Sequence, residues 1–364
     1  MKRLLLSLTA LAALTALKAQ VNMLTPQRQG LAAIAALEAK GDLAGLSKAI
    51  DEGLDNGLTV AQVKEALSQL YAYTGFPRSL NALGTLQRVV AEREASGKAT
   101  TAGEDGPVLP EDFDSLAEGT RVQTQLTGTP FNYEFCPRED YYLKAHLFGD
   151  IFSGKALDKA EREIVTVSAI SVLEGCAPQL ASHARGSLNM GVTEAELRAL
   201  PSVLEEKVGA VEAWRLRKAI AGIFNEESSE GAPVDFNIWP KGEPNTAYAE
   251  YFIGNSYLAP MDAAAGGPVN VTFEPGCRNN WHIHRKGVQV LICVAGRGWY
   301  QEWGKEPVEM TPGTVIAIPA EAKHWHGAAK DSWFQHLTYT TRLGEGASNE
   351  WLEPVTDEVY GKLR

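Results

Sequence analysis

The sequence predicts two folds in tandem, an all-α N-terminal region built from two copies of one helical unit and an all-β barrel after it. Two observations indicate this multidomain α + β class. Across residues 22–95 and 138–223, apolar residues recur at three- and four-residue intervals, the spacing of helices that pack along one face. From Tyr248 onward, short β-rich runs separated by glycine and proline replace that pattern.

Polar stretches rich in glycine and proline mark the boundaries between these regions. We expect a leader at 1–20, a first helical repeat at 21–96, a linker at 97–119, a second helical repeat at 120–224, a linker at 225–247 and the barrel at 248–364.

The two helical repeats are visible in the sequence itself. AIDEGLDNGLTVAQV (49–63) matches HARGSLNMGVTEAEL (183–197) at an offset of 134 residues, since 183 − 49 = 134. We expect the shared glycine to end one helix in the left-handed conformation and the shared threonine to cap the next. The alternative is that helix-turn-helix chemistry recurs by chance. The paired positions are Gly57 with Gly191 and Thr59 with Thr193.

The N-terminus has the pattern of a secretory signal peptide. Lys2 and Arg3 precede an apolar run that ends at Leu17, and Ala19 offers a small residue for cleavage. The run of about 14 residues is shorter than the ~20 that cross a bilayer as a helix. We therefore expect a periplasmic or secreted protein with no membrane attachment after cleavage. An amphipathic first helix or an uncleaved anchor is the alternative.

The formal net charge is −11, from 34 basic and 45 acidic residues. An acidic surface disfavours nucleic acid and anionic membranes as partners. It leaves a small-molecule substrate open. The four cysteines are too few for a disulfide framework in a chain this long, and no pairing can be read from their spacing. They are Cys136, Cys176, Cys277 and Cys293.

The densest cluster of chemically active side chains lies in the predicted barrel, where five of the seven histidines fall between 282 and 336. His282 and His284 are two residues apart, so on a strand both imidazoles point to the same face. His324 and His326 repeat that spacing. This arrangement favours a divalent-metal site, and the alternative is a set of structural histidines.

The same residues resemble the cupin superfamily. Its first motif consists of a glycine, an HxH pair, an acidic residue and a second glycine. The chain matches this motif, with Gln289 in the acidic position. Its second motif is matched up to His324, with Glu321 in place of the second glycine. The resemblance implies a cupin barrel whose metal ligands are His282, His284, Gln289 and His324.

One branch of that superfamily is closer. VTFEPG, WHIH, PGTV, KHWHGAA and EPVTDEVY are similar to the bacterial cupin-type hydroxynitrile lyases, over about 110 residues from Tyr248 to Tyr360. That resemblance implies a lyase with manganese as the expected ion, and iron, zinc or nickel also suit such ligands. The chain departs from the branch by one inserted residue between His284 and Gln289. It also has Thr340 where those lyases carry a glutamine near the substrate.

A site of three histidines and a glutamine has a distinct chemistry. All four ligands are neutral, so the ion keeps its full charge and is a stronger Lewis acid than it would be beside a glutamate. His326 and His336 are expected to line the same cavity as the ligands without binding the metal, and either could be the general base that removes a proton from a substrate hydroxyl before C–C cleavage. Both could instead be packed or surface residues. The nearby tryptophans fit either barrel packing or an aromatic pocket wall. They are Trp281, Trp299, Trp325 and Trp333.

The helical region resembles the carboxymuconolactone decarboxylase family, including its alkylhydroperoxidase-like branch. The matching stretches are YAYTGFPRSLNAL and EREIVTVSAISVLEGCAPQLASHARGSLNMGVTEAEL. Cys176 and His183 match the first Cys and the His of that branch's CxxCxxxH motif, but Gln179 replaces the second Cys. A dithiol cycle therefore cannot close locally. The first repeat has Asp42 and Ala49 at the equivalent positions.

The leading hypothesis is an exported, metal-dependent cupin lyase that acts on small hydroxyl or carbonyl compounds. The resemblance of the helical region implies a homo-oligomer. Three alternatives stay open: a decarboxylase or isomerase of lactone-like compounds, a thiol antioxidant enzyme that uses Cys176 and His183, and a non-catalytic ligand-binding cupin.

Overall fold

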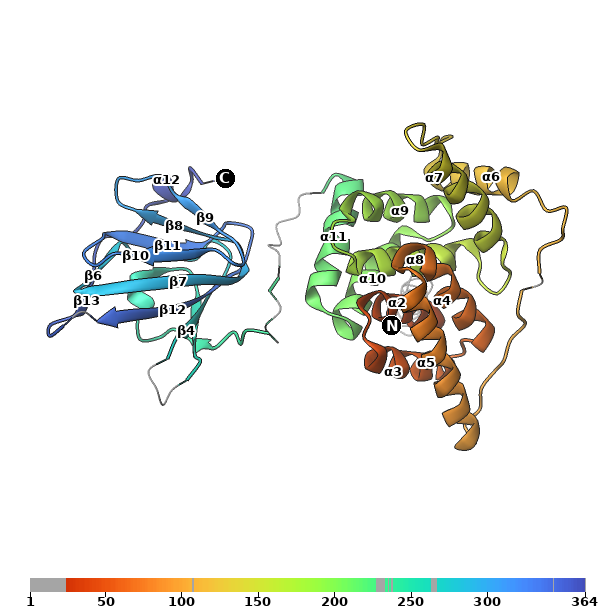
Figure 1. The fold of residues 1–364 in the computed structure, drawn as a ribbon, viewed down its shortest axis with the longest axis horizontal. Coiled ribbons are helices and arrows are strands. Elements are labelled where there is room, and N and C mark those ends of the chain that lie inside the picture. The colour runs from red at the N-terminus through yellow and green to blue at the C-terminus, as the bar shows by residue number, and fades with distance from the viewer. Residues whose placement is uncertain are drawn as a thin grey trace, which may run out of the picture. The chain divides into compact units, whose positions relative to one another are not determined.

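The computed structural model describes residues 24–106, 108–226, 233–234, 236, 238–262, 267–342 and 344–363 (Figure 1). The chain divides into two compact units, Met1–Ser228 and Ser229–Arg364, which we call the helical unit and the barrel unit. The predicted signal peptide at 1–20 lies outside the described residues. Within the described part of the chain, no helix has both the length and the apolar character needed to span a membrane.

The helical unit consists of two sets of four helices with a connecting helical segment between them. The first set is α2 (Pro26–Lys40), α3 (Leu43–Asp55), α4 (Val60–Thr74) and α5 (Phe76–Ala95). The connecting segment holds α6 (Ser115–Thr127), α7 (Pro137–Tyr141), the π-helix η1 (Tyr142–Asp150) and the 3₁₀ turn η2 (Ile151–Ser153). The second set is α8 (Lys159–Val172), α9 (Ala177–Asn189), α10 (Glu194–Lys207) and α11 (Ala210–Phe224).

The predicted internal repeat is confirmed. Adding 134 to the bounds of α3 gives the bounds of α9, because 43 + 134 = 177 and 55 + 134 = 189. Gly57 and Gly191 both have positive φ, 95° and 103°. Thr59 and Thr193 each form a capping box at the start of the next helix, as predicted.

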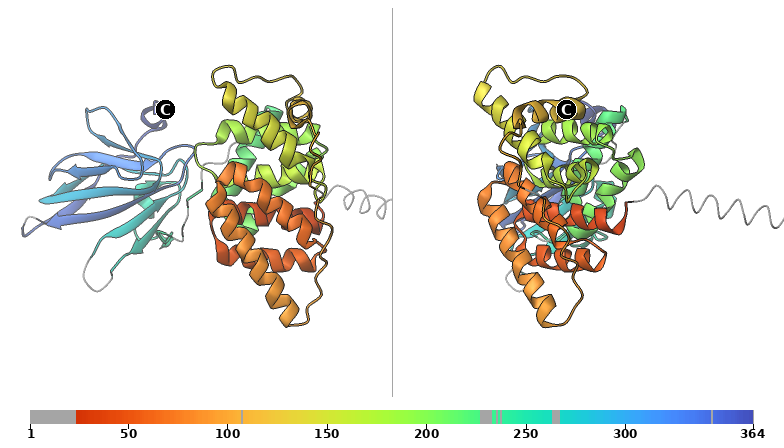
Figure 2. Two further views of the ribbon diagram at one scale, coloured as in Figure 1. Left: turned by 45° about the vertical axis from the view of Figure 1, so that its right-hand side comes forward. Right: turned by 90° about the vertical axis from the view of Figure 1, so that its right-hand side faces the viewer.

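The two repeats join along α2 and α8, which are buried on nearly all sides. Arg28 and Arg162 occupy equivalent positions on these helices, since 28 + 134 = 162, and each reaches into the other repeat. Arg28 donates to Glu196 Oε1 at 2.6 Å, and Arg162 pairs with Glu65. Arg162 is fully buried, which lowers its pKa to about 10. Figure 2 shows the two sets of helices side by side from two further directions.

The connection between the repeats is partly helical. Helix α6 begins at Ser115, inside the stretch assigned to the first linker, because the Asp114 side chain accepts a hydrogen bond from the Ala117 N–H and caps the helix.

The barrel unit is built almost entirely of antiparallel strands, so the predicted fold class is confirmed (Figure 1). The strands are β1 (Glu243–Pro244), β2 (Phe252–Ile253), β3 (Ser256–Pro260), β4 (Val269–Phe273), β5 (Arg278–Asn279), β6 (His282–Arg285), β7 (Gly287–Gly296), β8 (Gly298–Glu302), β9 (Val308–Met310), β10 (Val315–Ile318), β11 (His324–Ala328), β12 (Phe334–Arg342) and β13 (Ser348–Trp351). A 3₁₀ turn, η3 (Ala249–Tyr251), and a short helix, α12 (Asp357–Tyr360), complete the unit.

These strands form two sheets that enclose a core. One sheet has the order β1-β3-β4-β12-β7-β10, and the other has the order β13-β6-β11-β5-β2 with β8 and β9 beside β11. Along β7, buried residues alternate with partly exposed ones, as expected where one face of a strand points inward. Phe273, Leu291 and Phe334 fill the apolar part of the core. The histidine cluster occupies the polar part of the same interior.

Candidate metal centre

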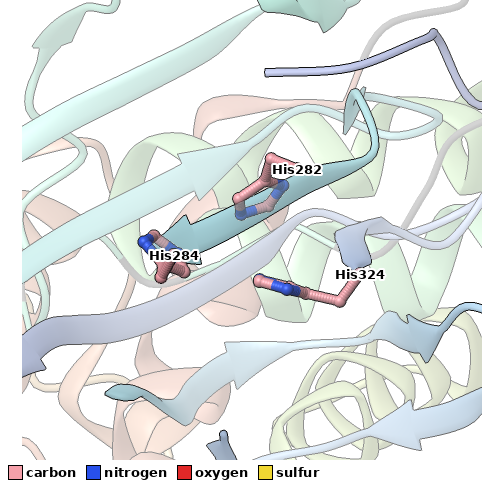
Figure 3. Close-up of side chains that lie close together, drawn as sticks. All are labelled: His282, His284 and His324. Atoms are coloured by element: carbon pink, nitrogen blue, oxygen red, sulfur yellow. The ribbon is translucent and has the colours of Figure 1, made fainter. Parts of the chain in front are cut away.

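Three histidines meet inside the barrel unit. Strand β6 carries His282 and His284 on its inward face, and the neighbouring strand β11 places His324 directly opposite His282. The three side chains are buried, and one ligand nitrogen from each lies within 4.8 Å of the others. Figure 3 shows His282 and His284 on one strand and His324 on the strand beside it, with the three side chains close together. The structure thus brings together the three histidines that the motif predicted.

The hydrogen bonds of the rings leave one nitrogen of each histidine directed at a common point. The Nδ1 atoms lie 3.0 Å from Asn280 O for His282, 2.6 Å from Asn349 Oδ1 for His284 and 2.9 Å from Ala322 O for His324. These oxygens only accept hydrogen bonds, so each Nδ1 carries a hydrogen and each Nε2 a lone pair. The Nε2 atom of His284 is buried without a partner.

Gln289 on β7 adds an oxygen to the cluster. Its Nε2 donates to Thr338 Oγ1 at 3.0 Å, which turns Oε1 toward the histidines. That Oε1 lies 3.1 Å from Nε2 of His324. With the hydrogen of His324 on Nδ1, two lone pairs face each other across this gap. A cation between them resolves that repulsion, so the residues present fit a divalent metal ion bound by nitrogen and oxygen.

The site is uncharged at neutral pH. Burial lowers the pKa of His282 well below its usual value and that of His324 to about 4, and it also lowers the pKa of His284. Neutral imidazole is the form that binds a metal. Among the described residues, the candidate metal cluster contains no carboxylate.

Glu321 replaces a cupin-motif glycine but points away from the centre. Its φ of 67° lies in the left-handed region that favours glycine, which explains why the motif has glycine there. The Glu321 carboxylate pairs with Arg285 at 2.6 Å and accepts from the Lys286 N–H at 2.8 Å. These contacts offset the strained backbone and tie the loop before β11 to the end of β6.

His326 and His336 form a second pair behind the ligand cluster. Asn279 Oδ1 accepts from the His326 backbone N–H at 2.9 Å, so Asn279 Nδ2 faces the His326 ring, 3.1 Å from Nε2. Nδ1 of His326 lies 3.2 Å from Nε2 of His336. Burial lowers the pKa of both, to about 4 for His336. Both rings are therefore neutral near pH 7 and able to accept a proton.

A cavity of about 720 Å³ opens onto the cluster. His326 lines it together with His282, His284 and Gln289, whereas His336 lies behind His326 and is not among the lining residues. The sequence analysis expected His336 to line the same cavity, and the structure places it in contact with the lining residue instead.

The aromatic wall of the cavity differs from the tryptophans singled out by the sequence. Trp351 lines the cavity and packs against His282, with ring centroids 4.7 Å apart and the ring planes tilted by 35°, and Tyr248 and Phe252 lie beside it. Trp281 and Trp325 belong instead to a small core of their own. Three residues, Trp351, Asn349 and Thr338, were missed because none lies within a recognisable motif. Asn279 was missed because it stands at a variable position of the first cupin motif, between Gly276 and His282.

In the helical unit, His183 has a partner that the sequence analysis did not identify. Its Nδ1 lies 2.9 Å from Oε2 of Glu163, which is fully buried and has no partner for Oε1. Tyr73 packs edge-on against His183, and burial together with Glu163 raises the Tyr73 pKa. Cys176 occupies the N-cap position of α9 without a capping hydrogen bond from its side chain, and no hydrogen bond within the described residues joins it to His183.

All four cysteines are free in the structure. Burial raises the pKa of Cys277 and Cys293 to about 12, which makes these two thiols unreactive at neutral pH.

Comparisons with known proteins agree with this architecture. A model of the carboxymuconolactone decarboxylase family matches residues 7–88 and 138–221, and a cupin domain model matches 269–335. An (R)-mandelonitrile lyase of Granulicella tundricola is 42% identical over 116 residues, which are 31% of this chain and 87% of the relative.

Solved structures include similar chains. A cupin-like protein of Thermotoga maritima is 35% identical and aligns over 34% of this chain and 95% of its own, with a TM-score of 0.31. A predicted oxalate decarboxylase of the same organism is 16% identical and aligns over 28% of this chain and 95% of its own, with a TM-score of 0.25.

Through its C-terminal barrel, the chain belongs to the cupin family that includes the (R)-mandelonitrile lyase, and its N-terminal unit is a helical domain of the carboxymuconolactone decarboxylase family.

Proposed function

We propose that the barrel unit is a metal-dependent lyase that cleaves or forms a C–C bond next to the hydroxyl or carbonyl carbon of a small compound, as in a cyanohydrin. The observation that carries this proposal is the convergence of three histidine Nε2 lone pairs and the Gln289 carbonyl oxygen at one buried point. The 42% identity to an (R)-mandelonitrile lyase supports the reaction class.

His282, His284, His324 and Gln289 would hold the ion. Because all four are neutral, the bound metal would act as a Lewis acid on a substrate oxygen with its charge undiminished. Manganese is the first candidate, and iron, zinc or nickel also suit nitrogen and oxygen ligands.

His326 and His336 would move the proton. His326 lines the cavity and would accept the hydrogen of a substrate hydroxyl at Nε2, in place of the hydrogen bond from Asn279 Nδ2, while the hydrogen on its Nδ1 passes to Nε2 of His336. The oxygen electron pair then forms the carbonyl as the C–C bond breaks, and the leaving carbanion, such as cyanide, departs with the bonding electrons. Before a substrate binds, the hydrogen bond from Asn279 holds the His326 ring in place.

The cavity wall suits an apolar substrate body. Trp351, Tyr248 and Phe252 supply aromatic faces next to the cluster. Because the histidines are neutral, Arg285 is the one charged side chain among the described lining residues, and it is paired with Glu321 and Glu350. A neutral hydroxylated compound therefore fits the wall better than an anion.

The test is the release of benzaldehyde from mandelonitrile by protein loaded with Mn²⁺. We expect turnover by the wild type, a loss of about 100-fold or more in His282→Ala, and wild-type rates in Cys176→Ser. Unchanged turnover in His282→Ala would contradict a barrel metal site. Loss of all activity in Cys176→Ser would instead support a thiol enzyme in the helical unit.

A second candidate function concerns the helical unit. The hydrogen bond between the partly exposed His183 and the buried Glu163 is an arrangement suited to proton transfer, which supports a decarboxylase or isomerase activity on lactone-like compounds. If this unit carries the chemistry, His183→Ala abolishes lactone turnover and His282→Ala leaves it intact. A purely ligand-binding cupin would turn over none of these substrates when loaded with metal.

We also propose export and self-association. Export is supported by the basic and apolar pattern of residues 1–20, and N-terminal sequencing of the mature protein from the periplasm or medium tests it. Self-association is supported by exposed aromatic side chains on one segment of the helical unit. These are Phe131, Tyr133, Phe135, Tyr141 and Tyr142.

A further inference from the structure

Strand β13 lies against the strand that carries two of the metal ligands. It pairs antiparallel with β6, and the register sets Asn349 opposite His284 and Trp351 opposite His282. Directly opposed residues on paired strands point to the same face of a sheet. The Asn349 side chain is therefore directed into the barrel, beside the ring of His284.

The contact between these two side chains differs from the corresponding contacts of the other histidines. The Nδ1 atoms of His282 and His324 donate to main-chain carbonyls two residues earlier in the chain, at Asn280 and Ala322. Nδ1 of His284 donates to the side-chain Oδ1 of Asn349 at 2.6 Å, across 65 residues of sequence. His284 is thus the histidine of this cluster whose ring orientation depends on a replaceable side chain.

The effect of the hydrogen bond to Asn349 is visible at the other ring nitrogen of His284, Nε2. Nε2 of His284 is buried and finds no hydrogen-bond partner among the described residues. A buried nitrogen without a partner is costly unless a ligand meets it. The hydrogen bond to Asn349 places the hydrogen on Nδ1 and so directs the Nε2 lone pair at the cluster. Outer partners of this kind commonly set both the tautomer and the metal affinity of a ligating histidine.

We propose that Asn349 is a positioning residue of the metal centre, which holds His284 in the tautomer and orientation that bind the ion. Strand β13 is then part of the centre although it lies outside the region that the cupin model matches, residues 269–335. This inference rests on the proposed metal-binding function of the barrel.

The experiment compares Mn²⁺ affinities, measured by competition with a chelator, for the full-length wild type and three variants. We expect Asn349→Ala to bind about 10- to 100-fold more weakly. Asn349→Asp keeps an acceptor for the Nδ1 hydrogen, so we expect it to bind within about threefold of the wild type. Asn255→Ala is the matched control, because that asparagine is exposed and its amide donates to Glu274.

A second readout reports on the ring itself. In ¹⁵N spectra of the metal-free protein, we expect His284 to carry its hydrogen on Nδ1 in the wild type and in Asn349→Asp, and to populate both tautomers in Asn349→Ala. Asn349→Ser, whose shorter side chain cannot reach the ring, should match the alanine variant and replaces it if the alanine variant does not fold.

The outcomes separate the two proposals. The role of Asn349 would be overturned, and the metal site would stand, if Asn349→Ala and Asn349→Ser bind Mn²⁺ within twofold of the wild type. The same conclusion would follow if the His284 tautomer is unchanged in these two variants. A wild type that binds no Mn²⁺ while its His284 carries the expected tautomer would overturn the proposed function instead.

Discussion

Acidification should destabilise the metal-free barrel through its buried histidines. Burial lowers the pKa of His324 and of His336 to about 4. In the unfolded chain both groups return to about 6.5. The unfolded state then binds more protons than the folded state at every pH between these values. The stability that the neutral rings provide is present above pH 6.5 and is lost progressively as the pH falls toward 4.

The size of the effect follows from these pKa values. At pH 5.5 each histidine is about 90% protonated in the unfolded chain and almost unprotonated in the folded one, which costs about 1.4 kcal/mol per residue relative to pH 7.5. His324 and His336 together account for about 3 kcal/mol. The pKa values of His282 and His326 are also lowered by burial, so they add to the loss in the same direction.

The assay is urea unfolding of EDTA-treated protein at pH 7.5 and 5.5, followed by tryptophan fluorescence. Seven of the eight tryptophans lie between 239 and 351, so the signal reports mainly on the barrel unit. We expect the midpoint to fall by about 1 M urea or more, given slopes of ~1–3 kcal/mol/M. His336→Leu should remove about 1.4 kcal/mol of the pH dependence. Equal unfolding free energies at the two pH values would refute the reasoning.

Three further outcomes are expected. Burial raises the pKa of Glu38 to about 6, so the stability that its protonated carboxyl contributes is lost as the pH rises through 6. Glu38→Gln should therefore remove about 1 kcal/mol of the change in unfolding free energy between pH 5 and 8. Urea unfolding followed by circular dichroism measures this change. Gln289→Glu adds a negative charge to the centre, so Mn²⁺ affinity should rise about tenfold or more while mandelonitrile turnover falls. Faster turnover in this variant would argue against a Lewis-acid role of the metal. Phe135 is 91% exposed and should contribute to self-association. Phe135→Ser should therefore lower the mass measured by light scattering, and an unchanged mass of an oligomer would show that this surface does not join the copies.

Local sequence signals predicted much of this fold. The 134-residue offset identified the two helical repeats because each repeat needs the same glycine and threonine to end one helix and begin the next. The HxH spacing placed His282 and His284 on one face because side chains alternate along a strand. Both inferences depend only on residues close together in the chain.

The partners that complete the sites could not be found in the same way. Asn349 reaches His284 across 65 residues, and Glu163 reaches His183 across 20. Each contact depends on the register or packing of two separate elements, and one asparagine or glutamate carries no spacing signal of its own. Trp351 was missed for the same reason, since its place in the cavity wall follows from the pairing of β13 with β6.

The most direct test of the metal centre is the metal content of purified protein after loading with Mn²⁺ and desalting, determined by mass spectrometry. The arrangement of His282, His284, Gln289 and His324 predicts one ion per chain in the wild type and none above background in a His282→Ala, His324→Ala double variant whose circular dichroism matches the wild type. A wild-type protein without bound ion, or a double variant that retains a full equivalent, would contradict the centre described for this barrel.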